Sequence, residues 1–101
     1  MEKRIELHEI LCTLLGSRNV YFQPPESVKL KFPAIVYKRK NIDSVFADNN
    51  VYARFNAYEV VVIDSDPDSE YVTKVSNLPR CRFERHYTAD NLNHDAFTLY
   101  Y

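Results

Sequence analysis

Hydrophobic residues recur at helical spacing near the start of the chain and at alternate positions along most of the remainder. In the first segment five apolar side chains repeat every three or four positions: Leu7, Ile10, Leu11, Leu14 and Leu15. The only glycine, Gly16, follows them, and glycine commonly ends a helix in the left-handed conformation. The spacing therefore predicts an amphipathic helix over residues 2–15.

Two long strands are predicted in the middle of the chain. The double proline at 24–25 interrupts any regular element, so residues 17–32 are interpreted as a long ordered loop. Pro33 then precedes an apolar segment, 34–39, that predicts a strand. Residues 51–63 alternate and become apolar on both faces, which is typical of a central strand. A polar tip that ends at Asn50 is expected to join the two strands.

The acidic segment 64–70 is interpreted as the start of a second helix. Ser65 or Asp66 would cap it, and Pro67 would occupy its first turn. Four apolar residues form its expected buried stripe, namely Tyr71, Val72, Val75 and Leu78, and Pro79 ends it. A calcium loop starting at Asp64 does not fit, because its sixth position is Ser69 instead of glycine and its twelfth is Val75 instead of glutamate. The helix start is the better interpretation.

Two further strands end the chain. Residues 81–87 alternate, and Cys81, Phe83 and Tyr87 are expected to share one face. In residues 96–101 the expected inward set is Phe97, Leu99 and Tyr101. The turn between the strands contains Asp90, Asn91 and Asn93, whose side chains commonly close turns by hydrogen bonding. The order predicts a single α+β domain with a mainly antiparallel or mixed sheet of about four to five strands and two helices on one face.

Length and charge limit the possible functions. A chain of 101 residues buries only about 60 to 68% of its unfolded surface, so self-association would help to stabilise it. The 13 basic and 14 acidic residues give a net charge of −1, which provides no overall attraction to nucleic acid or to an anionic membrane. The two cysteines form neither a disulfide framework nor a zinc pattern. The start of the chain lacks the apolar run of a signal peptide, so we expect synthesis in a cytoplasm.

Candidate catalytic and metal-binding groups are few. His86, Asp90, His94 and Asp95 are close in sequence, but their spacing matches no common ligand pattern. If the last strands form a hairpin, His94 is expected near Tyr87. His8 and Cys12 could touch on the first helix, yet no third group and no oxyanion pocket are indicated. We therefore expect no catalytic residue, no metal, no cofactor and no small-molecule substrate.

A basic segment offers a second class of function. Five cations are interleaved with two aromatic residues, in the order Lys29, Lys31, Phe32, Tyr37, Lys38, Arg39 and Lys40. This mixture resembles the surfaces that bind single-stranded nucleic acid. Lysines that protect a sheet edge from aggregation explain the same pattern. Nucleic-acid binding is therefore kept as the less favoured alternative.

Several motifs together are similar to a family of small phage and prophage proteins that are described as tail completion, or tail terminator, proteins of long-tailed phages. They are Asn19-Val20-Tyr21-Phe22-Gln23-Pro24-Pro25, Phe32-Pro33-Ala34-Ile35-Val36-Tyr37, Ala47-Asp48-Asn49, Val62-Ile63-Asp64-Ser65-Asp66-Pro67-Asp68-Ser69, Tyr87-Thr88-Ala89-Asp90-Asn91-Leu92-Asn93-His94 and Phe97-Thr98-Leu99-Tyr100-Tyr101. The similarity extends over nearly the whole chain.

The resemblance implies a non-enzymatic virion protein that is made in the cytoplasm of a bacterial host. Similar terminators are six-fold rings that cap the tail tube and provide a docking surface for the head. The implied partners are further copies of the chain, the tail tube protein and head-tail connector proteins, with DNA passing through the ring and no membrane contact. A head-tail connector of the neck is the alternative within virion assembly.

Two polar turns are the candidate contact surfaces. The first is the tip between the long strands, together with the start of the second strand, and its residues are Ile42, Val45, Phe46, Asp48, Asn50 and Tyr52. The second is the turn between the last two strands, with Asp90, Asn91, Asn93 and His94. Exposed apolar groups beside polar turns are common where subunits meet.

Overall fold

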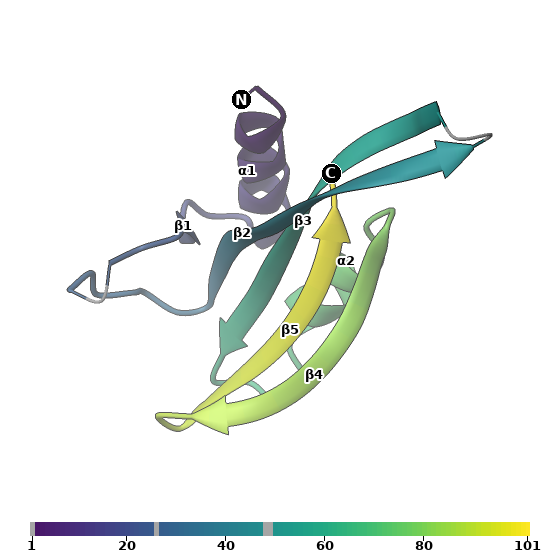
Figure 1. Ribbon diagram of the computed structural model, residues 1–101. Coiled ribbons are helices and arrows are strands. Elements are labelled where there is room, and N and C mark those ends of the chain that lie inside the picture. Colours follow the sequence, from purple (N-terminus) through teal and green to yellow (C-terminus); the bar gives the residue numbers. More distant parts are fainter. Residues whose placement is uncertain (1, 26, 48–49) are drawn as a thin grey trace.

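The computed structural model describes residues 2–25, 27–47 and 50–101, and describes side chains for 4–25, 27–40 and 57–101. Two helices cover one face of a five-stranded sheet (Figure 1). The elements are α1 (Glu2–Leu15), β1 (Val20–Phe22), β2 (Ala34–Ala47), β3 (Asn50–Asp64), α2 (Glu70–Ser76), β4 (Cys81–Ala89) and β5 (Leu92–Tyr100). The predicted α+β architecture, with both helices on one face, is confirmed.

The sheet has the strand order β1-β2-β3-β5-β4. Its pairs are antiparallel except for β1, which runs parallel to β2. Strand β3 lies between β2 and β5, and its second half, which is apolar on both faces in sequence, pairs with both neighbours. The expectation of a central strand is therefore confirmed.

The main core lies between the sheet and the helices. Leu7 and Leu11 of α1 and Val75 of α2 are buried against it. From the sheet, Tyr37 and Phe97 add large buried rings. A smaller cluster lies on the opposite face of the sheet, the outer face, and contains Val61, Ile63 and Ala96 with the partly buried Leu30, Val36 and Leu92. The chain therefore buries apolar side chains on both faces of its sheet.

The two helices differ in how well their ends were predicted. Helix α1 ends as expected, because Gly16 has φ of 77° and its amide donates to the Cys12 carbonyl at 2.9 Å. Helix α2 begins later than predicted. Its N-cap is Ser69, whose Oγ accepts from the Tyr71 amide at 3.3 Å. Pro67 therefore precedes the helix, and the acidic residues before it form side-chain turns instead of a first helical turn.

The predicted loop 17–32 contains the short strand β1, which the sequence analysis missed. Three residues are too few to establish a period, and the prolines that follow are typical of a loop. The remaining described residues of this segment, 23–25 and 27–33, lie in a loop whose ends are fixed. The Gln23 amide donates to the Tyr37 carbonyl at 2.9 Å, and the Asn19 side chain donates to the Pro33 carbonyl at 3.4 Å. This loop is called the 23–33 loop below.

A register shift in β4 changes which side chains share a face. Phe83 pairs with Phe97 on the helix-covered face, whereas Tyr87 pairs with His94, which lies beside Ile63 on the outer face. The shift lies between residues 83 and 85. An additional residue in one strand reverses the alternation beyond it. The prediction that Phe83 and Tyr87 share a face was therefore wrong.

Candidate interaction surfaces

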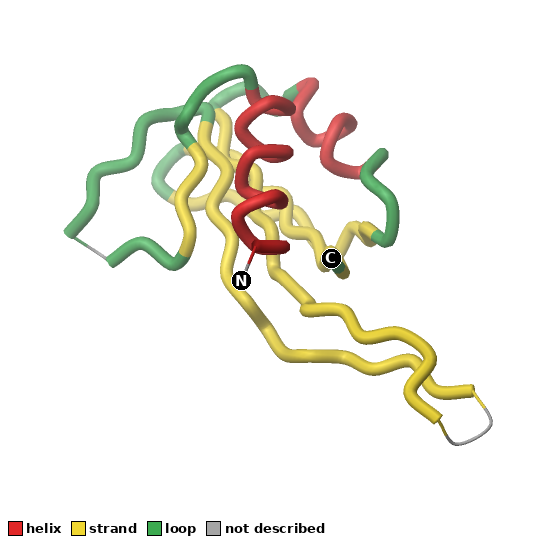
Figure 2. Tube along the Cα trace, turned by 90° about the horizontal axis from the view of Figure 1, so that it is seen from above, coloured by secondary structure: helices red, strands yellow, loops and turns green. Residues whose placement is uncertain are grey.

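The far part of the β2–β3 hairpin forms a two-stranded ribbon (Figures 1 and 2). Beyond the register shift at residues 39–41, β2 and β3 pair with each other up to Ala47 and Asn50. Strand β5 pairs with β3 only from Ala57 onward, and β1 pairs with β2 only over residues 35–37. The molecule measures 48 × 24 × 23 Å, and Figure 2 shows the ribbon leaving the body along its long dimension.

Most candidate residues of the predicted tip belong to strands instead of a turn. Ile42, Val45 and Phe46 are part of β2, and Asn50 and Tyr52 are part of β3. The predicted boundaries were wrong because the polar residues 41, 43 and 44 suggested a loop, although a strand without a covering layer can carry polar residues at any position. Asp48 lies outside the described residues, and the side chains of the other five also lie outside them.

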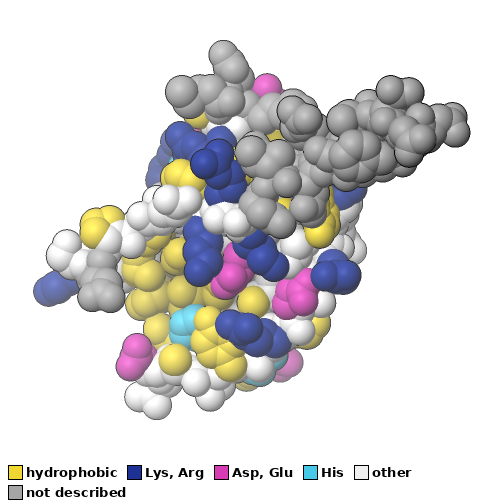
Figure 3. All heavy atoms as spheres, in the orientation of Figure 1, with side chains coloured by type: hydrophobic (Ala, Val, Ile, Leu, Met, Phe, Trp, Pro, Cys, Tyr) yellow, Lys and Arg dark blue, Asp and Glu magenta, His cyan; other side chains and the backbone are white. Residues whose placement is uncertain are grey.

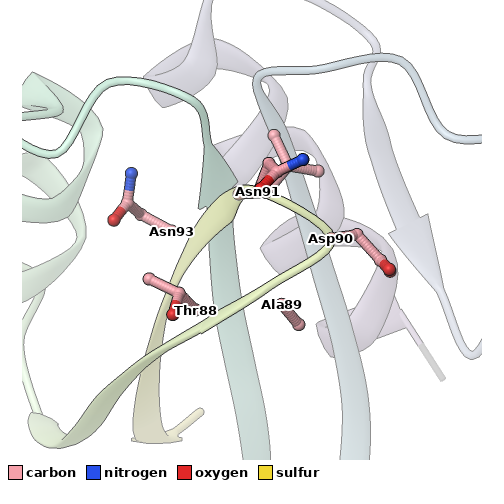
Figure 4. Close-up of a pocket in the computed structure, with 6 residues that line it drawn as sticks. Thr88, Ala89, Asp90, Asn91 and Asn93 are labelled. Carbon is pink, nitrogen blue, oxygen red and sulfur yellow. The ribbon is translucent and has the colours of Figure 1, made fainter.

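The β4–β5 turn brings the second set of candidates together (Figure 4). Asp90 and Asn91 are its two central residues, with φ of 53° and 62°, and Ala89 pairs with Leu92. Asp and Asn tolerate this left-handed conformation better than most residues, which explains a tight two-residue turn at this point. Figure 4 shows the side chains of Asp90 and Asn93 on opposite sides of the hairpin. Asn93 and His94 belong to β5 instead of the turn.

Hydrogen bonds fix this turn to the body of the protein through one residue. The Asn93 side chain donates to the carbonyls of Asp64 and Ser65, both at 3.3 Å. Among the described residues, Asp90 and Asn91 have no recorded side-chain hydrogen bond, so the turn closes through backbone conformation and pairing. Their exposed polar side chains are therefore available for a partner.

Tyr87 and His94 form a stacked pair on the outer face, as expected for a hairpin. Their ring centroids are 4.8 Å apart with planes 19° from parallel, and the Arg85 guanidinium lies 5.2 Å from the Tyr87 ring. His94 Nδ1 donates to the Leu92 carbonyl at 3.2 Å. A stacked aromatic pair under a cation is a rigid surface feature with an apolar body and polar edges.

Charges of both signs alternate across the outer face (Figure 3). Lys38 lies 4.0 Å from Glu59, and Arg82 lies 3.0 Å from Glu84. Hydrogen bonding, first from Thr98 and then from Arg82, holds the pKa of the Glu84 carboxyl below its usual range. Of the basic segment identified from sequence, Lys38 therefore has a carboxylate of the neighbouring strand β3 beside it.

His86 and Asp95 form a cross-strand pair. The Nδ1 atom of His86 lies 2.8 Å from Asp95 Oδ1, and Asp95 is buried. Within the described ranges, no three His, Cys, Asp or Glu side chains converge as metal ligands. The strand pairing, and the short distance between His86 and Asp95, assign His86, His94 and Asp95 to local contacts within the β4–β5 hairpin.

His8 and Cys12 have separate environments on α1. His8 Nδ1 lies 2.8 Å from the Tyr37 hydroxyl, and this hydroxyl accepts from Arg4 Nη1 at 3.5 Å. Burial lowers the pKa of His8 and raises the pKa of the Cys12 thiol. Burial also raises the pKa of Cys81 to about 11. A raised thiol pKa disfavours the thiolate, which is the nucleophilic form.

Two apolar surface features were missed by the sequence analysis. The first is a pocket between α1 and the segment that follows α2, and the second is the pair of exposed side chains Val28 and Phe32 on the 23–33 loop. Ile10 is one of the five apolar positions that predict α1, yet it is 37% exposed and lines the pocket. A helical period identifies the apolar face of a helix, but it does not show how much of that face other elements cover.

Compared with known proteins, the chain matches no family model, no curated protein and no solved structure at a significant level. Among the described residues, neither helix has the length and apolar character that crossing a bilayer requires.

Proposed function

We propose that this chain is a non-enzymatic assembly protein of a long-tailed phage, which caps the tail tube as a ring of identical subunits and contributes to the joint between head and tail. The motif similarity described above, from Asn19 to Tyr101, suggests this role. The observation that carries the proposal is the two-stranded ribbon formed by residues 41–47 and 50–56.

The ribbon supports an assembly role because of its energetics. An isolated two-stranded hairpin is marginally stable in water, and it usually requires a third strand or a packed layer. Strands β1 and β5 stop before the ribbon begins. Its sequence contains five apolar residues, Ile42, Val45, Phe46, Val51 and Phe55, and the burial of apolar residues by a neighbouring subunit or the tube is favourable.

The β4–β5 turn supplies the second proposed contact. Asp90 and Asn91 present exposed polar groups on a turn that is fixed by its own pairing. A pre-ordered turn loses little conformational entropy on binding. We assign the ribbon to contact with the tube or the next subunit, and the turn to a contact on the rim of the interface.

Tube assembly tests this function directly. The tail tube protein of the same phage is polymerised with increasing amounts of the chain, and tube lengths are measured by electron microscopy. We expect shorter tubes as the amount of the chain rises. Val45→Asp in the ribbon should reduce this effect by about tenfold or more, because a charge in a contact that excludes water is costly. Thr73→Asp, at an exposed position on α2, is the matched control and should act like wild type.

Tube lengths that do not depend on the chain would refute the capping role. If the chain binds purified head-tail connector proteins and not tubes, the neck connector replaces the terminator. Retention on DNA that weakens steeply as salt rises would favour the nucleic-acid alternative, because phosphate contacts release counterions.

A further inference from the structure

The helix-covered side of the protein carries a small apolar pocket. It has a volume of about 60 Å³ and is lined by Leu7, Ile10, Leu78, Pro79, Leu99 and Tyr101. A cavity that holds a single water molecule has a volume of about 10 to 15 Å³, so this pocket admits a larger group. Apolar cavities bind apolar groups in preference to water. The pocket is therefore suited to an apolar side chain from outside the subunit.

The rim of the pocket combines apolar surface with a carboxylate. Ile10 and Pro79 are both exposed at the rim. The Tyr101 hydroxyl donates to Glu6 Oε1 at 3.1 Å, which places this carboxylate beside the pocket. Among the described residues, Glu6 has no recorded ion pair, and it is exposed. A ligand that brings a cation next to an apolar group would match this rim.

The 23–33 loop offers such a group. Val28 and Phe32 are 38% and 43% exposed, while Leu30 between them packs on the outer face of the sheet. Lys29 and Lys31 alternate with these three residues and are exposed. The loop thus combines apolar and cationic side chains in a short segment.

Hydrogen bonds within the loop hold it in place. The Val28 amide donates to the Pro25 carbonyl at 3.1 Å, and the Lys31 amide donates to the Tyr21 hydroxyl at 3.3 Å. Insertion would therefore require little further ordering of the chain.

Other exposed apolar side chains fit the pocket less well. Phe83 packs edge-on against Phe97 at 5.5 Å, and Tyr87 stacks on His94. Ile5 lies on α1, the helix that forms one wall of the pocket, and Ile10 is part of the lining. Among the described aromatic residues, Phe32 has no recorded ring contact, so its ring is available.

A single copy of the chain cannot make this contact. Figures 1 and 2 both place the 23–33 loop on one flank of α1 and the C-terminus, with the pocket residue Tyr101, on the other. The two complementary features therefore belong to different surfaces. A contact between unlike surfaces of identical subunits repeats from copy to copy and forms a ring when the rotation closes.

We infer that the 23–33 loop of one subunit inserts Phe32, with Val28 beside it, into the apolar pocket of the next subunit, between its α1 and the segment that follows its α2. Lys29 or Lys31 then approaches Glu6 of that subunit. This contact rests on the proposed ring and deepens it by naming the two surfaces that join. Because the loop of one subunit meets the pocket of the next, a substitution can disable either the loop or the pocket alone.

Two variants that each remove one half test the contact. Phe32→Asp disables the loop and keeps the pocket, whereas Ile10→Asp disables the pocket and keeps the loop. We expect each variant alone to self-associate about tenfold or more weakly than wild type in analytical ultracentrifugation. Mixed in equal amounts, they should form a dimer that does not grow further, because only one intact loop and one intact pocket can meet.

Ile5→Asp is the matched control, since Ile5 is 49% exposed on the same helix but does not line the pocket. It should associate like wild type. Circular dichroism checks that each variant folds, and Pro79→Arg at the pocket rim replaces Ile10→Asp if that variant does not.

Three results would overturn the inference: a wild type that stays monomeric, a mixture that stays monomeric, or a control that dissociates as much as the pocket variant. The subunit contact and the tube-capping function can fail independently of each other. If the mixed dimer forms but the chain does not cap tubes, the contact between subunits is supported and the capping function is refuted. If the chain caps tubes but no mixed dimer forms, the capping function is supported and the ring must form through another surface.

Discussion

The buried hydroxyl of Tyr37 connects α1 to the sheet through two hydrogen-bond partners. Arg4 can only donate to it, so the hydroxyl proton is free to be donated to His8 Nδ1. This arrangement fits a neutral imidazole, in agreement with the lowered pKa of His8, whose first cause is burial. Histidine protonation therefore opposes the packing of α1.

The pH dependence of stability follows from this environment. The unfolded chain binds a proton at the ordinary histidine pKa, near 6.5, whereas folded His8 binds one only at lower pH. Between these two values the unfolded state holds more protons, so this residue makes stability rise with pH and fall on acidification. In urea unfolding between pH 5 and 8, His8→Gln should reduce the slope of the free energy of unfolding against pH. His94→Gln, on the outer face, is the control.

An unchanged slope in His8→Gln would mean that other groups determine the acid sensitivity.

Tyr37→Phe tests the hydrogen bond to His8 independently of pH. It removes the hydroxyl, and we expect it to lower the free energy of unfolding by about 0.5 to 1.5 kcal/mol at neutral pH, the usual contribution of one hydrogen bond.

At the level of elements, helix α1 could be predicted because its apolar residues repeat with the helical period. The second half of β3 could be predicted because a short run that is apolar on both faces is typical of a central strand. Strand β1 could not, because its three residues carry no period. The faces of β4 were misassigned because a bulge is a property of pairing, and the alternation of the sequence continues through it. The length of the ribbon was missed because its residues include many polar side chains.

The candidate surfaces divide in the same way. The β4–β5 turn and the contact between Tyr87 and His94 followed from hairpin geometry and turn residues. The apolar pocket did not, because it depends on how far α2 and the following segment extend over α1. Within an unbroken helix or strand, sequence patterns identify which residues share a face, but they do not identify where the layer that covers this face ends.

The start of α2 depends on one cap. Ser69 is buried, and its Oγ accepts from the Tyr71 amide. Ser69→Ala should lower the free energy of unfolding by about 1 kcal/mol, because it leaves a helical amide without its partner. Ser76→Ala at the exposed end of the same helix is the matched control and should change stability by less than about 0.5 kcal/mol. Equal losses in chemical denaturation would argue against the cap.

The β4–β5 turn depends on left-handed backbone at Asn91. Its φ of 62° is accessible to asparagine and glycine, whereas alanine is disfavoured there. We expect Asn91→Ala to reduce the free energy of unfolding by about 1 kcal/mol, and Asn91→Gly to keep or raise it. Thermal unfolding of the three proteins measures this order. An alanine variant as stable as the glycine variant would contradict the assigned turn.

At the level of the whole molecule, the protein combines a small packed body with surfaces that its own chain leaves uncovered. The ribbon extends beyond the neighbouring strands, the β4–β5 turn presents polar groups, and the 23–33 loop and the apolar pocket lie on opposite flanks of α1. These features account for the proposal of a ring-forming tail protein that acts through contacts instead of chemistry.

The position of the protein on assembled tubes tests that proposal most directly. Gold-labelled chain is added to tail tubes of the same phage, and the label is located by electron microscopy. We expect label at one end of each tube and none along its length, because a cap contacts only the terminal ring. Label distributed along the tubes, or tubes without label, would contradict the proposed function.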